Sequence, residues 1–170
     1  MNTKRVRMTV LTALFSALIF LGTYIIRIPS ASGYVHTGDG FVFLAAALLP
    51  ASYAIAASAV GGALSDLIAG YVMYVPITII VKALAALAVG QFLRTANVFS
   101  KKHDIFKNIT AALIGGAVNM AGYFLAETMI YGIGGAVAAL GGNAVQAAAG
   151  LAVFILTISP AQRALRNIKE

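Results

Sequence analysis

Residues 36–71, HTGDGFVFLAAALLPASYAIAASAVGGALSDLIAGY, decide the fold of this chain. The stretch opens with the polar turn HTGDG, which leads into an apolar run at residues 41–49. Pro50 interrupts that run, and a second apolar run follows that carries one acid, Asp66, near its far end. A carboxylate at the centre of a membrane helix costs roughly 2.5–3.5 kcal/mol on insertion scales, so Asp66 is a functional candidate. Two apolar segments therefore leave a polar turn and return toward it.

The composition is that of a membrane protein. Of 170 residues, 61% are hydrophobic and 10% are charged, and the mean hydropathy is +0.92. A soluble domain carries about 25% charged residues. We therefore predict a single integral membrane domain over residues 1–170. The absence of cysteine from the sequence excludes a disulfide, a thiolate metal site and a cysteine nucleophile.

The apolar runs predict an all-α bundle of six transmembrane helices. The first run, about nineteen residues long, is long enough to span ~30 Å of hydrocarbon. A signal peptide with a cleavage site near residues 30–32 is the alternative, although the run is long for one. Connections are expected at residues 27–40, 94–107 and the glycine-rich 132–142. The six predicted helices cover residues 8–26, 39–49, 50–71, 76–93, 108–131 and 143–158.

The cations set the expected orientation. They gather before the first helix, between the fourth and fifth, and after the sixth, which are three places on one side of a six-helix protein. The positive-inside rule then predicts that both termini are cytoplasmic. This placement explains the basic composition without nucleic acid, and no aromatic residues interleave with the cations as a nucleic-acid groove requires. The cations concerned are Lys4, Arg5, Arg7, Arg94, Lys101, Lys102, Lys107, Arg163, Arg166 and Lys169.

The costliest polar side chains converge in the outer layer of this bundle. At ~1.5 Å of rise per residue, Asp66, Lys82 and Glu127 each lie within about 10 Å of the outer ends of their helices. Asn119, Tyr123 and Glu127 share one helix face at spacings of four residues. His36 and Asp39 are expected at the outer mouth of the second helix. The pattern predicts a polar cavity open to the outside. Its candidate binding residues are Tyr34, His36, Asp39, Asp66, Lys82, Asn119, Tyr123, Glu127, Asn143 and Gln146.

Two other interpretations of these residues stay open. Lys82 could form a purely structural ion pair with Asp66 or Glu127, which would hold helices together without a ligand. Tyr24, Tyr34, Tyr71 and Tyr74 could serve as interfacial anchors, with Tyr34 in the first loop the best candidate for a lid that stacks on a ligand.

Catalytic motifs are absent from the sequence. It contains neither a GxxxxGK[ST] phosphate loop nor an HExxH metal motif. His36 and Asp39 could share a metal, but one His and one acid three residues apart more often mark the start of a helix. We expect no catalytic residue, no metal and no cofactor.

Three segments, GYVHTGDGFVFLAAALLP, GGALSDLIAGY and VPITIIVKALAALAVG, resemble the substrate-binding S components of energy-coupling factor (ECF) transporters, in the riboflavin-type group of vitamin and vitamin-precursor binders. The resemblance implies a six-helix membrane fold that binds its substrate near the outer face. It also implies a partner T component and two ABC ATPases. In relatives the first loop, here residues 27–40, covers the ligand, and helices 4 to 6 supply ligand contacts.

The first helix carries small residues at intervals of four, Thr9, Ala13 and Ala17. Small residues at this spacing allow another helix to approach closely. In the family such residues contact the T component; Ala13 and Ala17 match that pattern, and Thr9 extends it.

The sequence and the resemblance together predict a non-enzymatic subunit of an ECF-type importer in a bacterial plasma membrane. Its substrate would be a small flat heterocycle with hydroxyl or amino groups, for which pyridoxine or hydroxymethylpyrimidine fits better than riboflavin. The alternatives are a self-sufficient proton-coupled carrier that uses Asp66 or Glu127, and a membrane scaffold.

Overall fold

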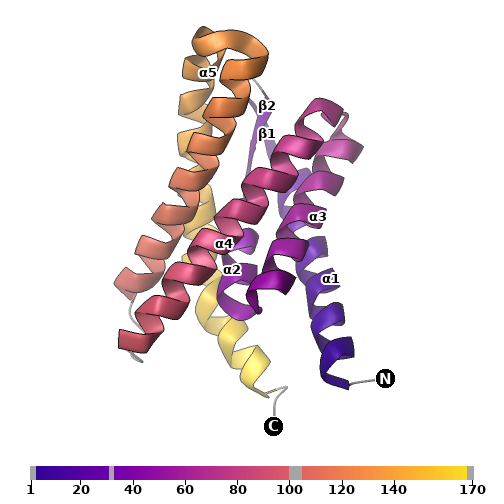
Figure 1. Ribbon diagram of the computed structural model, residues 1–170, viewed down its shortest axis with the longest axis vertical. Helices are drawn as coiled ribbons and strands as arrows, with labels where there is room; N and C mark the ends of the chain where they lie inside the picture. Colours follow the sequence, from indigo (N-terminus) through magenta and orange to yellow (C-terminus); the bar gives the residue numbers. More distant parts are fainter. Residues whose placement is uncertain (1–2, 31–32, 100–104, 168–170) are drawn as a thin grey trace.

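The computed structural model describes residues 3–30, 33–99 and 105–167. These residues form a bundle of helices with one small β-hairpin (Figure 1). In chain order the elements are α1 (Thr3–Tyr24), β1 (Arg27–Ser30), β2 (Gly33–His36), α2 (Gly38–Leu48), α3 (Ala51–Ala69), the 3-10 turn η1 (Val72–Tyr74), α4 (Val75–Phe99) and α5 (Ile105–Asn167).

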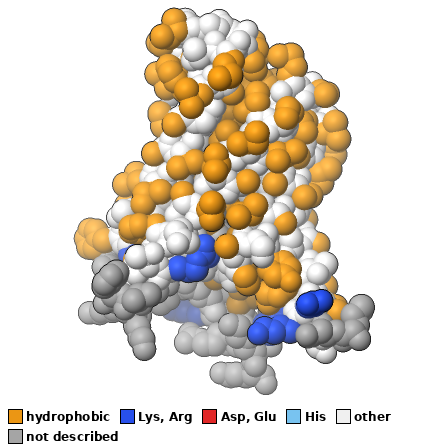
Figure 2. All heavy atoms as spheres, in the orientation of Figure 1, with side chains coloured by type: hydrophobic (Ala, Val, Ile, Leu, Met, Phe, Trp, Pro, Cys, Tyr) orange, Lys and Arg blue, Asp and Glu red, His pale blue; other side chains and the backbone are white. Residues whose placement is uncertain are grey.

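The described helices suit a lipid environment. Four apolar stretches are long enough to cross a membrane, in α1, α3, α4 with its preceding turn, and α5, and α2 is a shorter apolar helix. Apolar side chains cover most of the face in Figure 2, and Lys and Arg side chains gather at the end where α1 begins. The prediction of a helical membrane protein is therefore confirmed. Of the cations used for orientation, Lys101, Lys102 and Lys169 lie outside the described residues.

Helix α5 corresponds to the last two predicted helices. It runs for 63 residues but contains one non-helical residue, Gly132, whose φ of 75° and ψ of 173° suit only glycine. In Figure 1 the ribbon of α5 rises, reverses and returns toward the end where α1 begins. We call the two arms 105–131 and 133–167. The predicted glycine-rich loop over 132–142 is therefore wrong, because residues 133–167 are helical. Backbone groups at membrane depth need partners, and a helix supplies them internally.

The first connection contains a hairpin that the sequence analysis did not predict. Strands β1 and β2 pair antiparallel, with Arg27 opposite His36 and Pro29 opposite Tyr34. Pro29 has no backbone N–H to donate, but β1 is an edge strand, where a residue can lack an N–H without breaking the sheet. We call the end of the bundle that carries this ribbon the hairpin end; the beginning of α1 and the end of α5 lie at the opposite end (Figure 1).

Several helix boundaries follow the turn residues. Helix α2 begins at Gly38, as the polar turn predicted, and Pro50 immediately precedes α3. Gly70 ends α3 in the left-handed conformation, with φ of 84°. Helix α4 is longer than predicted and reaches Phe99, so part of the expected basic connection is helical. Helix α1 spans Thr3–Tyr24 rather than 8–26.

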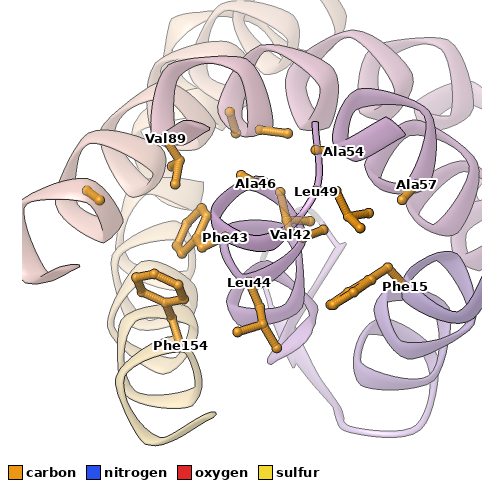
Figure 3. Close-up of a cluster of buried hydrophobic side chains, with 14 of the residues drawn as sticks. Phe15, Val42, Phe43, Leu44, Ala46, Leu49, Ala54, Ala57, Val89 and Phe154 are labelled. Atoms are coloured by element: carbon orange, nitrogen blue, oxygen red, sulfur yellow. The ribbon is translucent and has the colours of Figure 1, made fainter. Parts of the chain in front are cut away.

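The short helix α2 lies at the centre of the bundle. Its side chains Val42, Phe43 and Ala45 are completely buried, and α1, α3, α4 and α5 all contact it (Figure 3). The ring of Phe43 meets Phe154 of α5 edge to face, with centroids 6.2 Å apart. An 11-residue helix is too short to cross a membrane alone, and protein covers it on all sides. The start of α2 therefore lies inside the protein, where it carries Asp39 into the core.

Candidate functional site

A polar cavity of about 50 Å³ lies at the hairpin end. Its walls come from β2, α3, η1, α4 and both arms of α5, so elements far apart in the chain meet there. Phenol, hydroxyl, carboxyl, amide and imidazole groups make up most of the wall. The lining residues are Tyr34, Val35, His36, Asp66, Tyr71, Tyr74, Thr78, Tyr123, Glu127, Gly142, Asn143 and Gln146.

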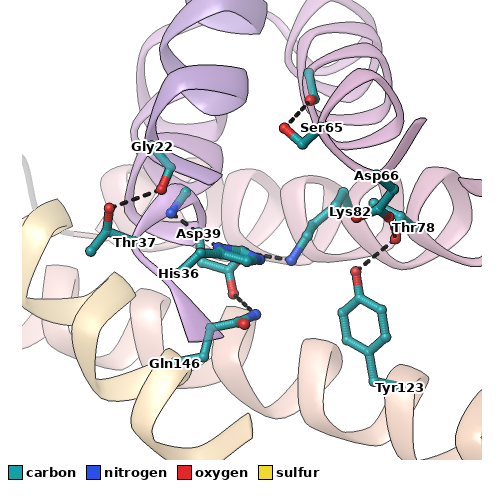
Figure 4. A network of polar contacts seen from close by, with 12 residues as sticks. Gly22, His36, Thr37, Asp39, Ser65, Asp66, Thr78, Lys82, Tyr123 and Gln146 are labelled. Atoms are coloured by element: carbon teal, nitrogen blue, oxygen red, sulfur yellow. Dashed lines mark hydrogen bonds and ion pairs between the residues drawn. The ribbon is translucent and has the colours of Figure 1, made fainter. Parts of the chain in front are cut away.

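Asp66 anchors one wall of the cavity. Its Oδ1 accepts a hydrogen bond from the Tyr34 hydroxyl at 2.8 Å. Its Oδ2 accepts one from the Thr78 hydroxyl (Figure 4). The Thr78 oxygen also lies 3.0 Å from the Tyr123 hydroxyl. Four elements, β2, α3, α4 and α5, therefore meet through one carboxylate. Helices α3 and α4 can approach this closely because a Cβ at Gly62 would lie only 2.8 Å from the Thr78 methyl.

Behind this wall lies a buried ion pair. Lys82 Nζ lies 2.5 Å from Asp39 Oδ1, and both side chains are only 1% exposed. Gln146 donates to the other oxygen of Asp39 at 2.9 Å. The alternative interpretation, in which Lys82 pairs with Asp66 or Glu127, is therefore wrong: Asp39 is its partner. The reason is depth: Asp39 was expected at the outer mouth of its helix, but α2 begins inside the bundle, within reach of α4.

His36 closes the cavity at the hairpin. Its Nδ1 accepts the backbone N–H of Gly38 at 3.2 Å. Burial lowers the pKa of this imidazole to about 4, because the charged form loses its hydration, and nearby Asp39 only partly opposes that loss. The ring is therefore neutral at pH 7. With Nδ1 accepting, its one proton lies on Nε2.

Aromatic rings form the cover of the cavity. Tyr34 packs edge to face on Tyr71, with centroids 5.1 Å apart, and the row continues through Tyr74 to Tyr123. The Arg27 guanidinium lies 5.5 Å from the centre of the Tyr34 ring. Burial and the Asp66 carboxylate raise the pKa of Tyr34, so its phenol stays protonated and donates to Asp66.

Seven of the ten predicted binding residues line the cavity: Tyr34, His36, Asp66, Tyr123, Glu127, Asn143 and Gln146. Asp39 and Lys82 lie behind the wall, and Asn119 is buried at 4% exposure without contact to the cavity. Both polar atoms of the Asn119 side chain lack a hydrogen-bond partner. The role of these residues in ligand binding stays a prediction.

Five lining residues were not predicted as binding residues: Val35, Tyr71, Tyr74, Thr78 and Gly142. Tyr71 and Tyr74 were interpreted as interfacial anchors, and Thr78 was not singled out. A signal was available, because Tyr74, Thr78 and Lys82 follow one another at intervals of four and therefore share a face of the helix. Among the described residues no group of three or more His, Cys, Asp or Glu could hold a metal ion.

Two features lie away from this cavity. On α1, the small residues Thr9, Ala13 and Ala17 are all exposed, so their face is open to another helix. A second cavity, of about 380 Å³, lies between the two ends of α5 at the end opposite the hairpin, where Ile105, Ile155 and Ile158 line it with four polar residues. Although it is larger, its wall comes from a single helix and the polar groups of α3, α4 and the hairpin do not converge on it. We therefore take the cavity at the hairpin end as the candidate site.

Comparison with known proteins gives two matches. The family model described as "ECF-type riboflavin transporter, S component" matches residues 3–162, nearly the whole chain. The chain is also similar to a protein from Pyrococcus woesei described as "Uncharacterized protein in gap 3'region". The two are 31% identical over 128 residues, which cover 75% of this chain and 82% of that protein.

Proposed function

Since the chain belongs to the family of ECF-type riboflavin transporter S components, we propose that it captures a small vitamin or vitamin precursor at the outer face of the cell membrane. It is a membrane transport subunit by family. In our proposal it performs no chemistry, and a T component and two ABC ATPases supply the energy for uptake. The observation that carries the proposal is the polar cavity at the hairpin end, where groups from five elements converge.

The size and lining of the cavity support a small ligand. Ligand pockets usually measure about 300–1,000 Å³, against about 50 Å³ here. Binding therefore requires the cover to move outward, and the hairpin with Tyr34 is the element placed to move. Tyrosine rings and a few directed polar groups suit a flat heterocycle with hydroxyl or amino substituents. Pyridoxine and hydroxymethylpyrimidine fit this description with less expansion than riboflavin needs, although riboflavin gives the family its name.

The proposed topology is six membrane crossings with both termini in the cytoplasm. The crossings are α1, the protein-covered α2, α3, α4 and the two arms of α5. This arrangement would put the hairpin end outside and, apart from Arg27 on the hairpin and the buried Lys82, the described cations inside, in accord with the positive-inside rule. The exposed small-residue face of α1, with Ala13 and Ala17, would then dock the T component.

Mass spectrometry of the small molecules released from purified, denatured protein tests the function directly. We expect a vitamin-like heterocycle that rebinds the emptied protein in a saturable manner. Uptake in cells should stop when the ATPases are deleted. Uptake that continues without them and follows the proton gradient would instead support a self-sufficient carrier that uses Asp66 or Glu127.

A further inference from the structure

The hydrogen-bond protons on the Asp66 wall are already used within the protein. Tyr34 and Thr78 each have one hydroxyl proton, and both donate it to Asp66. Thr78 therefore has no proton left for Tyr123, so in the 3.0 Å contact between them Tyr123 must donate. All three hydroxyls thus point their protons along the wall toward Asp66. What they can still offer to a ligand is oxygen lone pairs.

The two amide side chains on the second arm of α5, Asn143 and Gln146, also direct an N–H at an acid of the protein. Gln146 donates its Nε2 to Asp39, and Asn143 directs its Nδ2 to Glu127 at 3.5 Å. Each amide then keeps its carbonyl oxygen to accept and one further N–H to donate. His36 supplies the contrast, because its Nδ1 is occupied by Gly38 and its Nε2–H can donate.

The acids that line the cavity also favour hydrogen-bond donors over anions. Two carboxyl groups, those of Asp66 and Glu127, line the cavity. No Lys or Arg is among the described residues that line it. Two cations lie near the cavity without lining it. Lys82 is held by Asp39 behind the wall, where the two charges balance each other, and the Arg27 guanidinium lies beside the Tyr34 ring, 5.5 Å from its centre. An anion in the cavity would therefore meet two lining acids and no lining cation.

We propose that this cavity selects ligands rich in hydrogen-bond donors and excludes anions, so that amino, imino N–H and hydroxyl groups face the Asp66 wall and phosphorylated or carboxylated forms of the same ring are rejected. The inference rests on the proposed function and deepens it. A ring acceptor can meet His36 Nε2–H, and the ligand edge that faces the Asp66 wall donates. A cationic amine satisfies the site best, because it adds charge attraction to the two carboxyl groups.

Ligands that share a ring and differ in one group test this selection. Pyridoxine, pyridoxamine and 4-pyridoxic acid form one such series, and hydroxymethylpyrimidine with its phosphate ester and riboflavin with its phosphate ester form two pairs. We would titrate each into emptied, detergent-purified protein. Whichever ring binds, its anionic member should bind at least about tenfold more weakly, because it places like charges together and leaves acceptors facing acceptors. Equal or tighter binding of the anionic member would overturn the inference and leave the proposed function intact.

The remaining outcomes also decide. If none of these rings binds but the denatured protein releases another molecule, the charge of the released molecule serves as the test. A cation or a neutral hydrogen-bond donor supports the inference, and an anion overturns it. Protein that neither releases nor binds a small molecule would refute the proposed function, and the inference with it.

A substitution locates the effect. Asp66→Asn replaces an acceptor oxygen by an NH₂ donor while keeping the shape, so Tyr34 or Thr78 must turn its proton toward the cavity. The preference for the neutral or cationic member over the anionic member should fall about tenfold. Glu127→Gln removes the charge of the second carboxyl group and should also reduce the preference for the neutral or cationic member over the anionic member. An unchanged preference in both variants, each with an unchanged melting temperature, would contradict the assignment.

Discussion

The buried pair of Lys82 with Asp39 gives the sharpest stability prediction. In Lys82→Met the Asp39 carboxylate, 1% exposed, loses its counter-ion and keeps the hydrogen bond from Gln146. Removing one partner of a buried pair destabilises a protein by about 3–5 kcal/mol. At about 2–4 °C per kcal/mol for a chain of this size, the melting temperature should fall by about 6–20 °C. Because Lys82 does not line the cavity, the affinity of the folded fraction should change little.

Melting curves and ligand titrations on the same detergent-purified samples separate these effects. Arg5→Met, which removes an exposed cation on α1, is the matched control and should melt like the unmodified protein. The double variant Asp39→Leu with Lys82→Met removes both charges and should recover most of the loss, since apolar replacements of buried pairs are often neutral or stabilising. A normal melting temperature with a large loss of affinity in Lys82→Met would refute this reasoning and put Lys82 in contact with the ligand.

Four further predictions concern the open face of α1, the topology, Asn119 and His36. Ala13→Leu and Ala17→Leu should leave ligand binding intact but reduce uptake in cells with the complete transporter, because bulk on the open face of α1 prevents close helix contact; normal uptake in both would remove the docking face. A cysteine at position 102 should resist labelling from outside intact cells, and ready labelling would reverse the proposed topology. Asn119→Leu should raise the melting temperature, because a buried amide without partners is costly by about 1–3 kcal/mol, whereas a drop would show that the amide has a partner. The pKa of His36 is lowered to about 4 from 6.5, so its neutral form contributes fully to stability above pH 6.5, and this contribution is lost as the pH falls toward 4. His36→Gln should therefore flatten the dependence of stability on pH between these values. An equally steep dependence in that variant would show that His36 is not its source.

Much of the fold could be predicted from the sequence because membrane helices can be identified from the length and apolar composition of their segments. The polar turn before Phe41 and the proline after Leu49 placed α2 correctly. The same reasoning missed the hairpin, whose residues 27–36 combine proline, serine and glycine and show little of the alternation typical of strands. It also expected a loop after Gly132, because glycine is a weak helix former in water, whereas in a membrane the helix satisfies the backbone.

The candidate site was harder to predict than the fold. Spacing on one helix placed Tyr123 and Glu127 correctly at the cavity, but which side chains pair across helices depends on relative depth. The bounds of α2 were predicted well, but its start lies inside the bundle rather than at the mouth of the site. This difference in depth changed the expected place of Asp39 and the partner of Lys82. Thr78 shows the same limit, because a threonine in an apolar helix gains its role only from the acid on the neighbouring helix.

The most direct test of the central claim is an experimental structure of the protein purified with its native ligand. We predict density for a flat heterocycle at the hairpin end, between Tyr34, Asp66 and Gln146, with the hairpin displaced outward to make room. Density instead in the larger cavity between the ends of α5, beside Ile155 and Arg163, with the hairpin-end cavity unchanged, would contradict the account.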